Sequence, residues 1–336
     1  MSGLLTRRVQ VAAELEGTPG TAMTLTAVDA KILAYEPVFN FNPTMFKRDP
    51  YRKTLSRMYS IPGLRLCELT FKCELMGPPF ASQGTPCMFG NFLQACGFSE
   101  SLSAGTSNTY LPQSTGQKAI TIAVYEDGIR KQLAGAMGNV KIICNLGEPV
   151  MAEFTFMGKY SSHEDASMLS PTYPASKPLV FLNAAVTVFG DTLLMNSLEI
   201  DMQNEVVMQT DPSEESGYRA AKITGRNPQM TFDPEQELVA THDFISKLLS
   251  TDQAAVSMVM TAPDGMKLTL SMPKVRYIGL SEGDRDGLKT YAATCEVLMN
   301  AGDDEVSLIL GAGTTTSTTT TSTTTTSTTS TSTTIA

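Results

Sequence analysis

Residues that could carry out acid, base or nucleophilic chemistry are scarce in this chain of 336 residues. It has two histidines, His163 and His242. A nucleophile activated by a base would need one of them close in space to a serine or cysteine, and no motif indicates such an arrangement. His163 falls in a polar, proline-containing stretch and His242 at the start of an expected helix. We therefore predict no catalytic residue and do not expect an enzyme.

Patterns for metal or cofactor binding are also weak. The carboxylates at 303–305 and in the segment 282–286 lack the spacing of a calcium loop that ends in Glu. GAMG at 135–138 is better explained as a hairpin turn than as a nucleotide-binding loop. The cysteines have no CxxC spacing, so we expect reduced core side chains and no zinc site. They are Cys67, Cys73, Cys87, Cys96, Cys144 and Cys295. We expect no metal and no cofactor.

The elements that must position these residues are mostly strands. Segments rich in β-branched and aromatic residues, bounded by Gly, Pro, Asn or Asp, alternate in part between apolar and polar positions, which favours a sandwich or barrel over a parallel α/β fold. They cover 30–39, 64–75, 118–128, 139–146, 150–160, 184–190, 197–203, 254–262, 266–275 and 290–299. Two short helices are predicted. One covers 88–96 and is closed by Gly97, and the other covers 241–250 with Thr241 as its N-cap.

The chain contains an internal repeat. Residues 31–75 and 192–238 resemble each other as long hairpin units, each followed by a short helix and another hairpin. Asp-Pro pairs begin at Asp49 and Asp211, and Thr-Phe pairs at Thr70 and Thr231, at offsets of 162 and 161. The repeat therefore needs almost no gap, and it predicts two tandem β units.

Composition supports this division. We predict a first β domain over 1–162, a linker over 163–178 that contains three prolines, and a second β domain over 179–310. The Thr/Ser-rich tail, 311–336, has almost nothing to bury and is expected to be disordered or loosely extended.

Charge and hydropathy exclude several classes of function. Residues 1–165 hold 15 Lys and Arg against 14 Asp and Glu, whereas residues 166–336 hold 10 against 20, so nearly all of the net charge of −9 belongs to the second half. An acidic chain without a basic stripe is not expected to grip nucleic acid. There is no apolar run long enough for a transmembrane helix and no signal-peptide pattern, so we expect synthesis in the cytoplasm and no membrane insertion.

The two long hairpin connections carry opposite charges. The first, 46–57, holds five basic residues against Asp49, and the second, 205–215, holds only acidic ones. Such runs are often merely solvated, but opposite charges at equivalent positions of a repeat also suit complementary packing between subunits. We therefore predict assembly contacts in these connections. The residues are Phe46, Lys47, Arg48, Tyr51, Arg52, Lys53, Arg57, Glu205, Asp211, Glu214 and Glu215.

Ordered phrases over residues 9–305 resemble a known family. They include VQVAAELEGTPGTAMTLTAVDAKILAYEPVF, FLQACGF followed by TYLPQS, TIAVYEDGIRKQLAGAMGNV, EFTFMGKY, SLEIDMQNEV, GYRAAKITGRNPQMTFDPE and GDRDGLKTYAATCEVLMN. Together they resemble the tail tube (major tail) proteins of long-tailed bacteriophages, of the type with two tube domains. The Thr/Ser-rich tail departs from that pattern.

The resemblance implies a conduit rather than an enzyme. It implies two tail-tube-like β-sandwich or barrel domains, each with a flanking helix, that assemble into stacked rings and deliver DNA to the host. Two domains per chain imply rings of three chains with pseudo-sixfold symmetry, and the connections at 46–57 and 205–215 become the inter-ring loops. The implied partners are other copies of the chain, the tape-measure, terminator and tip proteins of the virion tail, and DNA in transit.

Two other hypotheses for the function stay open. The first is a tube subunit of a contractile injection or secretion system, which would share the fold. The second is a β-rich adhesin or binding module with a Thr-rich stalk, although that class normally has a signal peptide and an exposed aromatic platform.

Overall fold

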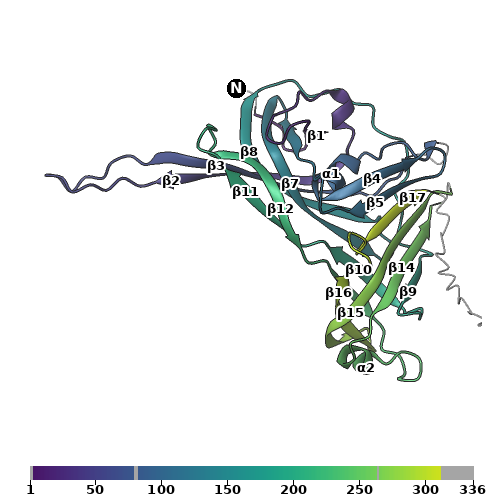
Figure 1. Ribbon diagram of the computed structural model, residues 1–336. Coiled ribbons are helices and arrows are strands. Elements are labelled where there is room, and N and C mark those ends of the chain that lie inside the picture. Colours follow the sequence, from purple (N-terminus) through teal and green to yellow (C-terminus); the bar gives the residue numbers. More distant parts are fainter. Residues whose placement is uncertain (1–2, 79–81, 263–264, 312–336) are drawn as a thin grey trace, which may run out of the picture.

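The computed structural model describes residues 3–78, 82–262 and 265–311 (Figure 1). Within these ranges the protein is mainly β with two short α-helices, as the sequence predicts. The strands of the first half are β1 (Val9–Leu15), β2 (Ala34–Phe46), β3 (Ile61–Glu74), β4 (Phe98–Ser103), β5 (Ser107–Pro112), β6 (Ile120–Glu126), β7 (Ile129–Asn145) and β8 (Met151–Asp165). The 3-10 helix η1 (Ala27–Ala30) precedes β2, and helix α1 (Gly90–Ala95) precedes β4.

The second half repeats this strand-rich organisation. Its strands are β9 (Ala185–Val188), β10 (Met195–Asp201), β11 (Asn204–Thr210), β12 (Tyr218–Arg226), β13 (Gln229–Pro234), β14 (Ala254–Thr261), β15 (Lys267–Arg285), β16 (Leu288–Leu298) and β17 (Ser307–Gly311). Helix α2 (Phe244–Leu249) lies between β13 and β14. The tail expected to be disordered, 311–336, lies outside the described residues after Gly311.

One large sheet runs through both halves of the chain. Its strand order is β2-β3-β8-β7-β10-β13-β16-β15-β17-β5-β4, and all of these pairings are antiparallel. The halves meet where β10 pairs with β7, with Asp201 opposite Lys141, and again where β17 pairs with β5, with Leu308 opposite Tyr110. The hairpin β11–β12 forms a separate two-stranded sheet.

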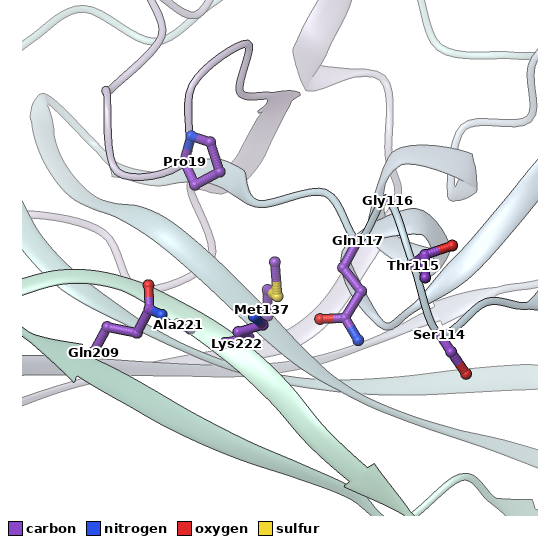
Figure 2. A pocket seen from close by; sticks show the side chains of 9 residues that line it. All are labelled: Pro19, Ser114, Thr115, Gly116, Gln117, Met137, Gln209, Ala221 and Lys222. Carbon is purple, nitrogen blue, oxygen red and sulfur yellow. The ribbon is translucent and has the colours of Figure 1, made fainter.

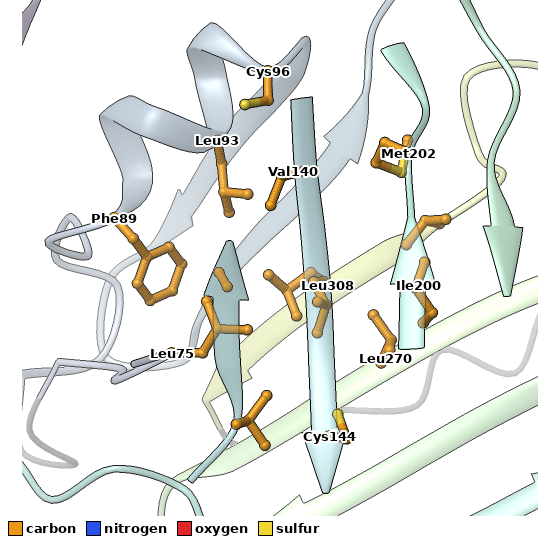
Figure 3. Close-up of a cluster of buried hydrophobic side chains, with 14 of the residues drawn as sticks. Leu75, Phe89, Leu93, Cys96, Val140, Cys144, Ile200, Met202, Leu270 and Leu308 are labelled. Atoms are coloured by element: carbon orange, nitrogen blue, oxygen red, sulfur yellow. The ribbon is translucent and has the colours of Figure 1, made fainter. Parts of the chain in front are cut away.

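The core lies on one face of this sheet and includes side chains from both halves (Figure 3). In the first half, Phe71, Phe154 and Phe156 alternate with polar residues on β3 and β8, and all three contact Phe92 of α1. The period of two places these rings on the face that α1 covers. Val140 of β7 and Ile200 of β10 extend the same cluster across the junction between the halves.

His242 belongs to the second half of the core. Its side chain is fully buried, its Nδ1 lies 2.8 Å from Asp191 Oδ2, and its Nε2 lies 3.1 Å from the Tyr277 hydroxyl. Burial, the dominant effect, lowers the pKa of His242 even though Asp191 opposes the shift. The ring thus joins the segment after β9 to β15, and the sequence reading of His242 as structural agrees with this geometry.

Three local predictions were wrong. Asp243, not Thr241, is the N-cap of α2, where it accepts a hydrogen bond from the Ser246 amide. The segment 135–138 is not a hairpin turn but a bulged part of β7, in which Gly135 adopts a φ of +60°. His163 does not lie in a loop, because β8 continues through it to Asp165.

Candidate assembly surface

The β2–β3 hairpin extends beyond the rest of the molecule as a long projection, which we call the arm (residues 38–66; Figure 1). Its strands pair as far as Phe46 opposite Ile61, and residues 47–60 connect them. Pro37 and Pro43 lie in β2, which is typical of an edge strand because proline cannot donate to a ladder. The large apolar side chains exposed on the arm are Val38, Phe41, Met45, Phe46, Tyr51, Leu55, Tyr59, Ile61 and Leu64.

The connection at the arm tip is basic. Arg48 lies 5.2 Å from the centre of the Tyr59 ring, and Arg52 donates to the Ser56 carbonyl at 3.1 Å. Lys47 and Lys53 are exposed. Residues 47–60 hold five basic side chains and one acidic one, a net charge of +4. The predicted assembly residues of the first connection therefore lie together at the end of the arm.

The second connection does not project in the same way. The β11–β12 hairpin lies over β7, β8 and the base of β3. Its acidic residues contact the first half of the chain: Glu214 pairs with Lys159 at 2.8 Å, and Glu215 pairs with Arg65 at 2.7 Å. The Arg65 amide also donates to the Ser216 carbonyl. Two of the four predicted acidic residues thus seat this hairpin within the chain.

The other two acidic residues have local roles. Asp211 accepts hydrogen bonds from the hydroxyl and amide of Ser213, and these bonds hold the pKa of Asp211 below its usual range. Glu205 is exposed at the start of β11. The structure does not bring the basic and acidic connections together within one chain, since the hairpin reaches only the base of the arm at Leu64 and Arg65.

Small residues make this seat possible. A side chain at Gly135 would meet Ala220 of β12 at 2.9 Å, so only glycine admits the hairpin so closely. Ala221 and Ile223 of β12 pack with Ala119 and Met137 beneath it. The β11–β12 hairpin therefore packs on the GAMG segment. The φ of Gly135 and the small side chains of this segment are explained by a contact with a residue more than eighty positions away in the sequence.

A groove runs beside this seat (Figure 2). It encloses about 450 Å³ between the hairpin and the segment 114–117, and Lys222 is its one ionisable side chain. A site for acid–base catalysis needs at least a paired donor and acceptor of protons. This groove does not have the composition of an active site.

Besides β1, β4, β9 and the β11–β12 hairpin, β2 and part of β15 have a partner on one side only in the described part of the chain. β2 pairs with β3 alone. β15 pairs with β14 and β17 along its first part, but from Arg276 to Arg285 it pairs with β16 alone. Unpaired edges of this kind are templates for pairing with another chain.

The face of the sheet opposite the core is polar and carries paired charges. Lys72 lies 3.5 Å from Glu153, Lys141 lies 2.7 Å from Glu199, and Arg276 lies 3.4 Å from Glu296. The hydrogen bond to Glu199 raises the pKa of Lys141. Because each of these three cations already contacts a carboxylate, these side chains offer little to hold phosphate groups.

An extended antiparallel sheet with open edges and a projecting arm is typical of a structural protein that assembles through its surface. The sequence profile of the family described as phage tail tube protein matches residues 6–292, and the chain belongs to that family. The resemblance to tail tube proteins seen in the sequence is thereby confirmed. A search of curated proteins returns no match.

Membership places the protein in the virion tail, as a structural component of a tube that assembles from copies of itself. The family is a structural one and is not known for enzymatic activity. No helix within the described ranges is long and apolar enough to cross a membrane. The sequence missed both the open strand edges and the in-chain contacts of Glu214 and Glu215, since each depends on which distant strands become neighbours.

Proposed function

We propose that three copies of this chain close into a ring with pseudo-sixfold symmetry, and that stacked rings form the conduit through which DNA passes to the host. The observation that carries the proposal is the β7–β10 pairing, because it joins the two halves of one chain by the same kind of contact that a ring needs between chains. When identical chains contact each other head to tail, which is a heterologous interface, and the rotation between them closes, they form a ring.

The strand order supports two equivalent units. One unit is β2-β3-β8-β7 and the next is β10-β13-β16-β15, in the same order along the sheet. The register of each first hairpin shifts by one residue at a matching place, between Tyr35 and Val38 in β2 and between Met195 and Leu198 in β10. We propose that these units belong to the two domains predicted from the sequence, 1–162 and 179–310, and that 163–178 links them, with β8 continuing to Asp165.

The internal junction predicts the register of the junction between chains. If the two units are superimposed so that Thr70 matches Thr231, Asn40 of β2 takes the place of Asp201 of β10. On the far side of each unit, the same superposition places Ser281 of β15 where Lys141 of β7 lies. Since Asp201 is opposite Lys141, Asn40 of one chain should lie opposite Ser281 of the next. The open edges of β2 and β15 would then pair, so that neither would remain exposed in the ring.

In such a ring the polar face of the sheet lines the lumen, because the core occupies the other face. That face carries carboxylates at Glu68, Glu74, Glu153, Glu199, Asp201 and Glu296, and cations at Lys72, Lys141 and Arg276. By register Asp233, Lys274 and Arg285 lie on the same face, so seven carboxylates stand against five cations. Such a wall repels phosphates and lets DNA slide without adhering.

The arm completes the proposal. Phe46, Tyr51 and the basic residues of the arm tip contact the adjacent ring, whereas Glu214 and Glu215 act within the chain by seating the second hairpin. The tape-measure, terminator and tip proteins are the other partners, and the protein is made in the host cytoplasm before it joins the tail.

Electron microscopy with symmetry analysis tests this proposal. Purified protein, or tails that contain it, should give hollow tubes made of rings with three chains each. Rings with six chains, or a protein that stays monomeric at every concentration, would overturn it.

A further inference from the structure

We infer that the receptor for the arm tip is an apolar hollow bordered by Leu146, Leu182 and Leu194, at the opposite end of a second copy of this chain in the next ring. The inference rests on the proposed tube and goes beyond it, because it assigns the surface that receives the arm. The occupant is defined as residues 47–60 of another copy.

The arm tip and the hollow lie at opposite ends of the same strands. β2 ends at Phe46 and β3 begins at Ile61 at one end, where β8 also finishes, whereas β7 ends at Asn145 and β16 begins at Leu288 at the other. In Figure 1 the arm points to the left, and β9, α2 and the β15–β16 turn lie at the lower right. Copies arranged head to tail therefore bring these two ends together.

The hollow has an apolar lining and an open mouth. It encloses about 210 Å³, and Leu146, Leu182 and Leu194 are each at least half exposed around it. A water molecule takes about 30 Å³ in the liquid, so the hollow has room for a large side chain. Backbone hydrogen bonds from Leu146 to Asn196 and from Gly147 to Phe181 hold these segments together, so the hollow is preformed.

The arm tip offers side chains that suit this hollow. Tyr51 and Leu55 are fully exposed within the chain, and Phe46 and Tyr59 are mostly exposed. Exposing these four large apolar side chains at the end of one projecting hairpin is unfavourable in water unless a partner covers them. Aromatic side chains seated in a preformed pocket are also the usual anchors of tight interfaces.

Charge is complementary at the two ends. The segments around the hollow, 146–149, 180–196, 233–247 and 284–290, form what we call the acidic end. They hold eight carboxylates against three cations, a net charge of −5. One of those cations, Arg285, already pairs with Asp233 and Glu235. The arm tip carries +4, so the approach of one ring to the next is favourable in only one orientation.

The first test removes the apolar contact from the receptor side. The double variant Leu182→Ser, Leu194→Ser changes two exposed side chains and should leave the chain folded and the rings closed. Tubes should shorten to single rings or short stacks, and Tyr51→Ser, Leu55→Ser on the arm should have the same effect. Leu102→Ser, an exposed leucine on β4, is the matched control and should leave tube length unchanged.

The second test exchanges charges between the two ends. Lys47→Glu with Lys53→Glu should reduce tube formation at low salt by at least tenfold, and adding Glu148→Lys with Glu237→Lys to the same chain should restore much of it. Rescue of one end by the other would not occur if either variant merely misfolded. Tube length is read by electron microscopy and ring mass by native mass spectrometry.

The outcomes separate this inference from the proposed tube. Failure of the wild-type protein to form any ring would remove the proposed function itself. Normal tubes from Leu182→Ser, Leu194→Ser, or a charge exchange without rescue, would leave the tube intact and overturn the receptor assignment.

Discussion

Ring closure makes a prediction about two residues far apart in the sequence, Asn40 and Ser281. If β2 of one chain continues the sheet of the next in the register of the internal junction, these residues face each other across the new seam. Replacing both with cysteine should therefore produce a disulfide between chains when assembled tubes are oxidised. Three such bonds would lock a ring, so a covalent trimer should be the largest product on a non-reducing gel.

The geometry of an antiparallel pair sets the resolution of this assay. Directly opposed residues have Cα atoms roughly 4.5–5.5 Å apart, within the range that a disulfide spans. A slip by two residues moves the partner to about 7–8 Å, near or beyond the limit, and a slip by one turns the side chain to the other face. Asn42→Cys with Ser281→Cys is the matched control, and it should cross-link far less.

The native thiols should not interfere, because all six cysteines are buried. Burial raises the pKa of Cys67 to about 12, that of Cys144 to about 12 and that of Cys87 to about 11. At pH 8 a thiol with a pKa of 12 is about one ten-thousandth thiolate, whereas an exposed engineered thiol with a pKa near 8.5 is about a quarter thiolate. Tubes that cross-link through the control pair but not through Asn40 and Ser281 would refute the proposed register.

Three further predictions concern the folded chain. Phe154→Ala should lower the free energy of unfolding by about 3–5 kcal/mol, because the ring is fully buried against Phe71, Phe92 and Phe156. Urea titration of the unassembled chain measures this loss, and a loss under about 1 kcal/mol would contradict the packing. Because burial lowers the pKa of His242, the unfolded chain binds a proton on this ring at a higher pH than the folded chain does. The stability of the fold should therefore decrease as the pH drops below about 6.5. The decrease between pH 7.5 and 5.5 should be smaller in His242→Gln, and equal slopes would exclude His242 as its source. Lys159→Met should weaken the docking of the β11–β12 hairpin by about 1–2 kcal/mol of free energy, because the Lys159 side chain is largely buried while Glu214 is partly exposed and can regain water. Hydrogen exchange over 204–226 should accelerate while β3 and β8 stay protected. Unchanged exchange would argue that the Lys159–Glu214 pair does not hold the hairpin in place.

Local patterns in the sequence were sufficient for the strand-rich class and for both helices. The alternation of Phe154 and Phe156 with polar neighbours predicts a strand with one buried face, and the structure buries both rings. The offsets that relate Asp49 to Asp211 and Thr70 to Thr231 match the order in which the strands recur along the sheet. These features are local or periodic, and the sequence records them directly.

What the sequence could not predict depends on contacts between distant segments. Gly135 looks like a turn residue, but its φ of +60° serves a bulge that admits Ala220. Glu214 looks like a free surface charge until β8 brings Lys159 beside it. Tyr51 and Leu55 stand in a polar stretch with no periodicity, so their joint exposure at the tip of an arm has no counterpart in the local pattern.

The fusion of two units in one chain also changes the thermodynamics of assembly. Each association between separate molecules costs on the order of 4–15 kcal/mol of translational and rotational freedom. In the proposed ring, the peptide chain makes every second seam in advance, as the β7–β10 junction, so a ring requires three associations where six unfused units would require six. The fused seam also forms at any concentration, which leaves its residues free to diverge, whereas the seam between β2 and β15 alone must be strong enough to decide when rings appear.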